Sequence, residues 1–204
     1  MNHDITNEVL TEFSTAFSSN PVNHIAMNAV TSAGLLAASK NPMAQRESRH
    51  SYSISLEQGE ITNQKQSGRC WMFAALNTFR FEVMKNLNLK TFELSQNYTL
   101  FYDKLEKSNY FLESILETLD EPTQGRLISF LLSAPLGDGG QWDMLCNLVR
   151  KYGVVPKEAM PETVASSATR EMTAALTRKL REDACRLRKA YADGSTLDEL
   201  RKKK

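Results

Sequence analysis

Paired cysteines, long apolar runs and a leader-like N-terminus are all missing from this sequence. Its three cysteines have no paired spacing, so we predict no disulfide framework and expect a reducing compartment. No stretch approaches about 18 consecutive apolar residues, so the sequence predicts no membrane-spanning helix. The first residues lack the basic segment and apolar run of a secretory signal. Together these features favour a cytoplasmic protein.

Metal and cofactor motifs are also missing. No cluster of histidine, cysteine, aspartate and glutamate has the spacing of a metal site. The glycine-rich stretch 137–140 is not followed by the Gly-Lys-Ser/Thr sequence of a phosphate-binding loop. The chain has no internal repeat. We therefore predict that the protein uses neither a metal nor a cofactor.

Charge of one sign does not dominate either, because the formal net charge is only +1. Hydrophobic residues at 41% and charged residues at 24% fit a globular protein, and 204 residues can bury a sizeable core. Residues 170–204 hold 11 basic and 6 acidic residues, which leaves nucleic-acid binding open as an alternative. Tyr191 is the one aromatic residue in that segment, so the pattern lacks the interleaved aromatics that stack bases.

Apolar periodicity predicts a mostly helical chain. We expect two N-terminal helices over 4–18 and 23–39, with apolar stripes that include Phe13 and Ile25, and then a polar connection over 40–50. Alternation of Tyr52, Ile54 and Leu56 with serines predicts one short strand. Further helices are predicted over 70–86, 95–119 with a break near 108–109, 124–133, 143–152 and 166–191. Ser95, and Ser195 with Asp198, are the expected N-terminal caps.

The most informative stretch is the loop 64–69 and the cysteine that follows it. Cys70 falls at the first turn of a predicted apolar helix, where unpaired backbone N–H groups and the helix dipole favour the nucleophilic thiolate. Gln64, six positions earlier, could join the backbone N–H of Cys70 as a second donor to a developing oxyanion. Cys146 and Cys185 lie within predicted helices and are expected to be structural.

The string from Asn63 to Asn77, with Gly68-Arg69-Cys70-Trp71 at its centre, resembles the active-site stretch of papain-type cysteine peptidases. It is most similar to the branch that contains bacterial aminopeptidase C and bleomycin hydrolase. The resemblance covers nearly the whole chain but only the first half of the usual length of that family. It implies an α+β papain-like fold, of which this chain would be the predominantly helical N-terminal half without the sheet-rich half.

The resemblance also implies roles for particular residues. Cys70 would be the nucleophile of an aminopeptidase that releases N-terminal amino acids through an acyl-thioester, and Gln64 would stabilise the oxyanion. Gly139 and Gly140 would bind the substrate backbone as an added strand, with Trp71 beside them. The implied organisation is an N-terminal helical arm over 1–50, a catalytic half-domain over 51–160 and the start of a helical insertion over 161–204. Members of the family form hexamers.

One part of the family pattern is missing. A papain-type mechanism needs a histidine and an asparagine far downstream of the cysteine, yet no histidine follows Cys70. His3, His24 and His50 all precede it and are expected to be surface or arm residues. We therefore expect little or no peptidase activity without a missing C-terminal half, whose loss would expose apolar surface around Trp71 and Trp142. The alternative is a fragment that binds peptides without cutting them.

Overall fold

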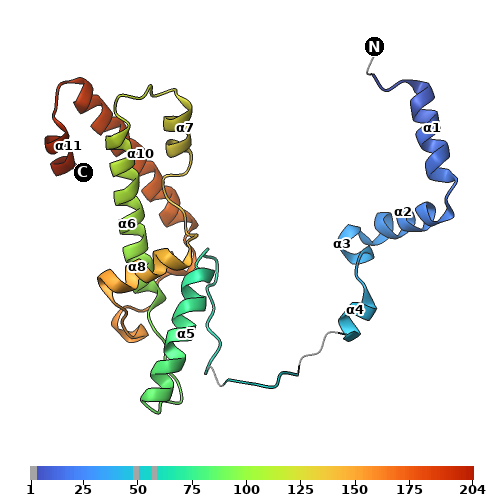
Figure 1. The fold of residues 1–204 in the computed structure, drawn as a ribbon, viewed down its shortest axis with the longest axis horizontal. Helices are drawn as coiled ribbons and strands as arrows, with labels where there is room; N and C mark the ends of the chain where they lie inside the picture. The colour runs from blue at the N-terminus through green and yellow to red at the C-terminus, as the bar shows by residue number, and fades with distance from the viewer. Residues whose placement is uncertain (1–3, 48–50, 57–58) are drawn as a thin grey trace. The chain divides into compact units, whose positions relative to one another are not determined.

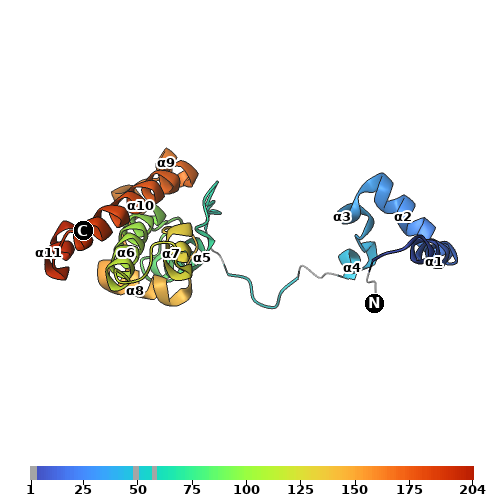
Figure 2. The ribbon, with the colours of Figure 1, turned by 90° about the horizontal axis from the view of Figure 1, so that it is seen from above.

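The computed structural model describes residues 4–47, 51–56 and 59–204, which form two compact units, Met1–Ser55 and Leu56–Lys204 (Figures 1 and 2). The first unit contains α1 (Asn7–Ser18), α2 (Pro21–Ala33), α3 (Leu35–Ala38) and α4 (Pro42–Glu47). The second contains α5 (Cys70–Asn86), α6 (Gln96–Glu117), α7 (Arg126–Ser133), α8 (Trp142–Tyr152), a 3₁₀ turn (Lys157–Ala159), α9 (Val164–Ser167), α10 (Arg170–Ala192) and α11 (Leu197–Lys203). Within these described ranges the predominance of helix agrees with the prediction.

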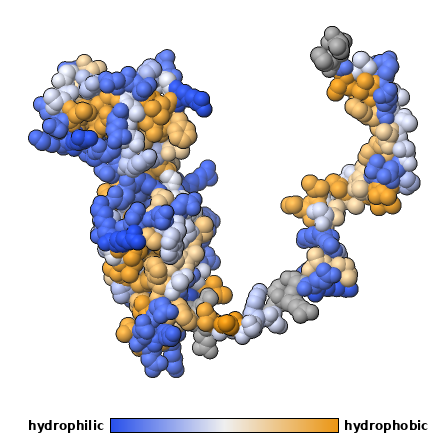
Figure 3. Space-filling model, in the orientation of Figure 1, coloured by the Kyte–Doolittle hydropathy of each residue, from blue (hydrophilic) through white to orange (hydrophobic). Residues whose placement is uncertain are grey.

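The first unit has helices with good caps but no interior. The Thr6 side chain accepts a hydrogen bond from the N–H of Val9, and Asn20 accepts one from Val22. None of the described residues of this unit is buried, and apolar side chains lie open along it (Figure 3). Phe13 and Ile25, from the predicted stripes, are 61% and 68% exposed. The helix expected over 4–18 is confirmed by α1, whereas the one expected over 23–39 is divided at Gly34 into α2 and α3. The apolar side chains have no cover among the described residues of this unit.

Two predictions for residues 40–56 are wrong. The connection expected over 40–50 contains α4, which begins at Pro42 with the Asn41 side chain accepting a hydrogen bond from the N–H of Met43. Asparagine followed by proline is a helix-start signal that works without apolar periodicity. The strand expected at Tyr52–Leu56 is absent from described residues 51–56, which are all exposed, because alternation alone cannot make a strand without a partner.

The larger core of the second unit lies where α6 and α10 run side by side, with α7 and α11 against them (Figures 1 and 2). Ile115 of α6 and Leu200 of α11 are fully buried there. On α10, Leu180, Ala184 and Leu187 are buried. This core therefore holds the long helices together.

A second core cluster lies beneath α5 and positions the candidate site. It joins Met72 and Ala75 of α5 to Leu100 of α6 and Leu145 of α8, and Trp71 packs against it. Met72 and Leu145 are fully buried. Because this cluster fixes α5 against α6 and α8, the first turn of α5 has a defined place relative to the loop that precedes α8.

The expected helix ends and breaks agree with the structure only in part, and the single helix expected over 166–191 is divided into α9 and α10. Ser95 caps α6 by accepting a hydrogen bond from the N–H of Tyr98, as predicted. The break expected near 108–109 does not occur, because the Ser108 hydroxyl donates to the carbonyl of Lys104 and fits within the helix. The cap expected at Ser195 with Asp198 is one residue off: the capping box is formed by Thr196 and Glu199.

Candidate active site

Cys70 is the first residue of α5 and its side chain is exposed. The Arg69 side chain makes no capping hydrogen bond to this helix. The first N–H groups of an α-helix have no intrahelical partner, so those next to Cys70 are not satisfied by this cap. Trp71, the next residue, is half-buried and turns towards the glycine-rich stretch 137–140. The predicted location of the cysteine at a helix N-terminus is therefore found.

The loop before Cys70 is folded by its own polar groups. The Ser67 hydroxyl donates to the carbonyl of Gln64 over 2.6 Å, and Lys65 has a left-handed φ of 55°. The N–H of Gln66 donates to the carbonyl of Ser167 over 2.9 Å, which ties the loop to the end of α9. Gln64 is half-buried in this turn. The loop thus approaches Cys70 in a fixed conformation.

Arg69 is the strongest anchor of this loop. Its side chain is fully buried, and its guanidinium donates to both carboxylate oxygens of Glu162 over 2.8 and 2.9 Å. Its Nε donates to the Ser67 hydroxyl, and its Cζ lies 5.0 Å from the centre of the Phe73 ring. Burial by itself raises the pKa of the Glu162 carboxyl, but hydrogen bonds from Arg69 and Ser166 outweigh it, so this pKa is lowered. The residue before the cysteine is therefore clamped by a bidentate ion pair.

The glycine-rich stretch is held by two lysines of α6. Lys104 is buried and donates to the carbonyl of Gly137 over 2.9 Å and to the Asp138 carboxylate over 2.5 Å. Lys107 donates to the carbonyl of Gly139 over 2.7 Å and to Asp103 over 2.8 Å. These contacts fix the backbone on both sides of Asp138.

Close packing locks the glycine-rich stretch to the Cys70 region. The indole N–H of Trp71 donates to the carbonyl of Asp138 over 2.9 Å. A Cβ atom on Gly140 would lie 2.4 Å from the Trp71 ring, so only glycine fits there. A Cβ on Gly139 would meet nothing within 4 Å. The structure therefore brings Trp71 and Gly140 together and leaves Gly139 open.

Acid should weaken this arrangement. Burial by itself would raise the pKa of the Asp138 carboxyl, but hydrogen bonds from Lys104, Thr169 and the N–H of Gly68 outweigh it and hold that pKa well below its usual range. Because the folded-state pKa is the lower one, Asp138 adds stability above about pH 4, which is lost as the pH falls towards the lowered value. In urea unfolding between about pH 4 and pH 2 we expect a falling free energy, with a shallower fall for Asp138→Asn. Equal slopes for the two proteins would contradict this.

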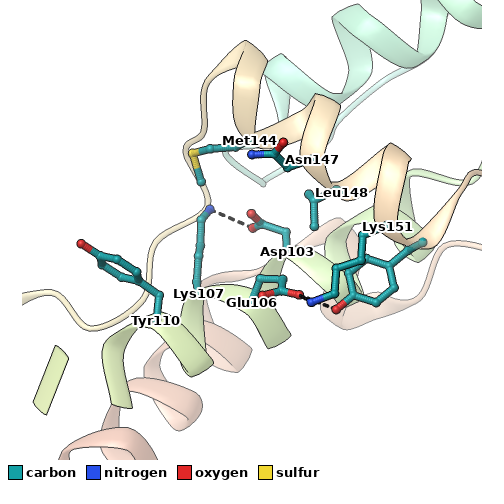
Figure 4. Close-up of a pocket in the computed structure, with 9 residues that line it drawn as sticks. Asp103, Glu106, Lys107, Tyr110, Met144, Asn147, Leu148 and Lys151 are labelled. Atoms are coloured by element: carbon teal, nitrogen blue, oxygen red, sulfur yellow. Dashed lines mark hydrogen bonds and ion pairs between the residues drawn. The ribbon is translucent and has the colours of Figure 1, made fainter. Parts of the chain in front are cut away.

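Among the hollows near the site region, two involve the glycine-rich stretch or the lysines that hold it. One of about 310 Å³ is lined by Trp71, Gly140 and Trp142 together with Ala74, Ala75, Thr78, Gln141 and Leu145. Trp142 is 60% exposed, as predicted. The other, of about 520 Å³, lies between α6 and α8 (Figure 4). Its charged side chains pair with one another: Lys107 with Asp103 within α6, and Lys151 of α8 with Glu106 of α6. The second pair ties α8 to α6.

The described residues of the second unit include no histidine. His24 is exposed on α2 of the first unit, where its ring meets that of Phe17 at 5.6 Å, as expected of an arm residue. His3 and His50 lie outside the described residues. Within the described ranges, no group of three histidine, cysteine or acidic side chains could hold a metal ion. None of the described helices is both long enough and apolar enough to cross a membrane.

Sequence reasoning assigned no role to several residues that shape the site. Asp138 was visible between two glycines, and Arg69 stood within the motif, but their partners lie far along the chain. Arg69 and Glu162 are 93 residues apart, and Gly68 and Asp138 are 70 apart. Only their charged residue types pointed to a role in the site. A buried charge needs a partner, and a single sequence does not show which residue that partner is.

Known proteins resemble the chain over most of its length. It matches the Peptidase C1-like family over residues 4–204. Aminopeptidase C of Listeria monocytogenes is 48% identical over 193 residues, 95% of this chain and 44% of the relative. Bleomycin hydrolase of Gallus gallus is 49% identical over 151 residues, 73% of this chain and 33% of the relative. The chain thus spans less than half the length of these curated relatives.

A solved structure gives the same result. PepW from Lactobacillus rhamnosis HN001 superposes with a TM-score of 0.93 at 46% sequence identity, covering 100% of this chain and 46% of that one. The helical arrangement described above is therefore that of part of a known fold. With the family match over residues 4–204, it follows that the chain belongs to the Peptidase C1-like family of cysteine peptidases, with the aminopeptidases C and the bleomycin hydrolases.

Proposed function

We propose that this chain carries the nucleophile half of a cysteine aminopeptidase. The observation that carries the proposal is an exposed cysteine at the N-terminus of α5, locked through Trp71 and Gly140 to a glycine-rich edge. In the reaction, the Cys70 sulfur bonds to the carbonyl carbon of the N-terminal residue of a peptide. The C–N bond then breaks, the amine leaves with a proton, and water hydrolyses the thioester to release the amino acid.

The surrounding residues have distinct roles in this proposal. The side-chain amide of Gln64 and the backbone N–H of Cys70 donate to the oxyanion of the tetrahedral intermediate. Gly139 and Gly140 bind the substrate backbone, for which the open space at Gly139 is suitable. Trp71 forms the wall beside this edge. No metal or cofactor takes part.

The proposal requires a general base from outside this sequence. No histidine follows Cys70, so we propose that the base and its orienting asparagine belong to a further part of a longer enzyme. On this view 51–160 is a catalytic half-domain, 1–50 an arm, and 161–204 the start of an insertion. The exposed apolar side chains of the arm are consistent with homo-oligomers of the longer protein.

A face of α5 offers a place for that further part. Cys70, Ala74 and Thr78 recur every four residues on one side of the helix, and all three are exposed. The Trp71–Trp142 hollow flanks this face on one side, and a second hollow of about 310 Å³, lined by Asn77 and Phe81, adjoins it. Small residues allow close approach, so a base could be delivered next to the cysteine.

Nucleic-acid binding has less support as an alternative. Many basic side chains of α10 and α11 are already engaged within the chain, since Lys179 pairs with Asp183, Arg186 with Glu182, and both Arg201 and Lys204 with Glu113. Arg181 and Arg188 donate to backbone carbonyls near the ends of α7 and α6. The charge available to phosphates is therefore smaller than the composition indicates.

The test is covalent labelling. An aminoacyl chloromethyl ketone should add one label per chain, on Cys70, with loss of chloride. Cys146 is half-buried and Cys185 exposed, so the two serve as internal controls for simple accessibility. We expect peptide mapping to find the label on Cys70 at least about tenfold faster than on Cys185, and Cys70→Ser to abolish this fast phase. Equal labelling rates at Cys70 and Cys185 would contradict the proposal.

A further inference from the structure

Asp138 connects the glycine-rich stretch to three other segments of the second unit. Its Oδ2 accepts from the N–H of Gly68 over 3.0 Å and from the hydroxyl of Thr169. Its Oδ1 accepts from Lys104 over 2.5 Å and from Thr173 over 3.3 Å. The loop before Cys70, α6 and the start of α10 therefore meet at one carboxylate of the glycine-rich stretch.

The backbone on either side of this carboxylate is in close contact with the Cys70 region. A Cβ atom on Gly68 would lie 2.8 Å from the Cβ of Asp138, so the approach of the two segments requires a glycine at 68. The carbonyl of Asp138 accepts the indole N–H of Trp71. Asp138 thus holds the residues on both sides of Cys70, Gly68 through its side chain and Trp71 through its backbone.

The charge of Asp138 also sets the position of Lys104. The two side chains are 16% and 7% exposed, so the ammonium group is nearly desolvated and depends on this carboxylate. Lys104 in turn donates to the carbonyl of Gly137. The carboxylate therefore orders the backbone of the glycine-rich stretch as well as the loop before Cys70.

We propose that Asp138 is a positioning residue that sets the distance and orientation of the peptide-binding edge, Gly139 and Gly140, relative to the sulfur of Cys70. This inference rests on the proposed function, because it presupposes that the edge binds a peptide and that Cys70 attacks it. Asp138 takes no proton and forms no bond in the reaction. Its effect is geometric, and misplacement of reacting groups by about 1 Å can reduce a rate roughly 100-fold.

The test compares two reagents on the full 204-residue chain. Iodoacetamide alkylates Cys70 without using the edge, whereas an aminoacyl chloromethyl ketone must lie along it. The ratio of the second rate to the first reports the position of the edge, and a general loss of stability does not lower it selectively. We expect Asp138→Asn to lower this ratio by about tenfold or more. The matched control is Asp183→Asn, at an ion pair on the surface of α10, which should leave the ratio within about twofold.

A second variant covers the case in which Asp138→Asn does not fold. Thr169→Val keeps the Lys104 pair but removes the hydroxyl that shares Oδ2 with the N–H of Gly68, and it should lower the ratio about threefold. A folded Asp138→Asn with an unchanged ratio would overturn the inference, as would an unchanged Thr169→Val where Asp138→Asn is unfolded. If the wild-type chain itself shows no preference for the aminoacyl reagent, the proposed function fails, and this inference fails with it.

Discussion

Replacing Arg69 by methionine is expected to lower the free energy of unfolding by about 3 kcal/mol, because it removes one partner of a buried ion pair. Arg69 is fully buried, and the Glu162 side chain is 25% exposed. Without the guanidinium, Glu162 loses two charge-assisted hydrogen bonds and keeps one from the hydroxyl of Ser166. The partial exposure of Glu162 places the expected cost at the lower end of the range for such pairs.

Urea unfolding at neutral pH measures this change. The matched control is Lys179→Met, which breaks a surface ion pair with Asp183 and should cost less than about 1 kcal/mol. The double variant Arg69→Met/Glu162→Leu should be more stable than Arg69→Met alone, since no charge is then left without its partner. If Arg69→Met were as mild as Lys179→Met, Arg69 would not be the anchor of the loop before Cys70.

A methyl group added at Gly140 is expected to cost about 2 kcal/mol, whereas the same change at Gly139 should be nearly neutral for stability. The new Cβ at 140 would lie 2.4 Å from Cζ2 and 2.5 Å from Cε2 of Trp71. These are atoms of a rigid indole whose N–H is bonded to the carbonyl of Asp138, so the ring cannot move without breaking that bond. At Gly139 a Cβ meets nothing within 4 Å.

The pair Gly140→Ala and Gly139→Ala should be compared by urea unfolding. Both variants add the same methyl group and remove the same glycine entropy from the unfolded chain, so their difference isolates the contact with Trp71. A larger loss at 139 than at 140, or equal stability of the two, would show that Trp71 does not pack against Gly140 in solution.

Much of the site could be predicted because its signals are local. The placement of Cys70 at the first turn of a helix follows from an apolar run after a polar loop, and α5 begins at that residue. Ser95 as a cap follows from its side chain and its position before an apolar stripe. The proposed roles of Cys70, Gln64, Gly139 and Gly140 came from the motif, and they remain proposals that the labelling experiments test.

What could not be predicted depends on distant or missing partners. The alternation at Tyr52–Leu56 is a real pattern, but a strand needs hydrogen-bonding neighbours, and residues 51–56 have none in the structure. The role of Asp138 depends on Lys104, Gly68 and Thr169, which are brought together only by the fold. The cap of α11 is Thr196 and not Ser195, a difference of one residue between neighbouring hydroxyls.

We propose that Cys70 is a peptidase nucleophile whose base lies outside this sequence. The most direct measurement is hydrolysis of an aminoacyl fluorogenic substrate by the 204-residue chain, made on the same sample in which Cys70 labelling is followed. We expect rapid labelling by the aminoacyl reagent and no hydrolysis above that of Cys70→Ser. Turnover that Cys70→Ser abolishes would contradict this proposal, because a histidine that precedes Cys70, such as His24, or another group of this chain would then have to act as the base.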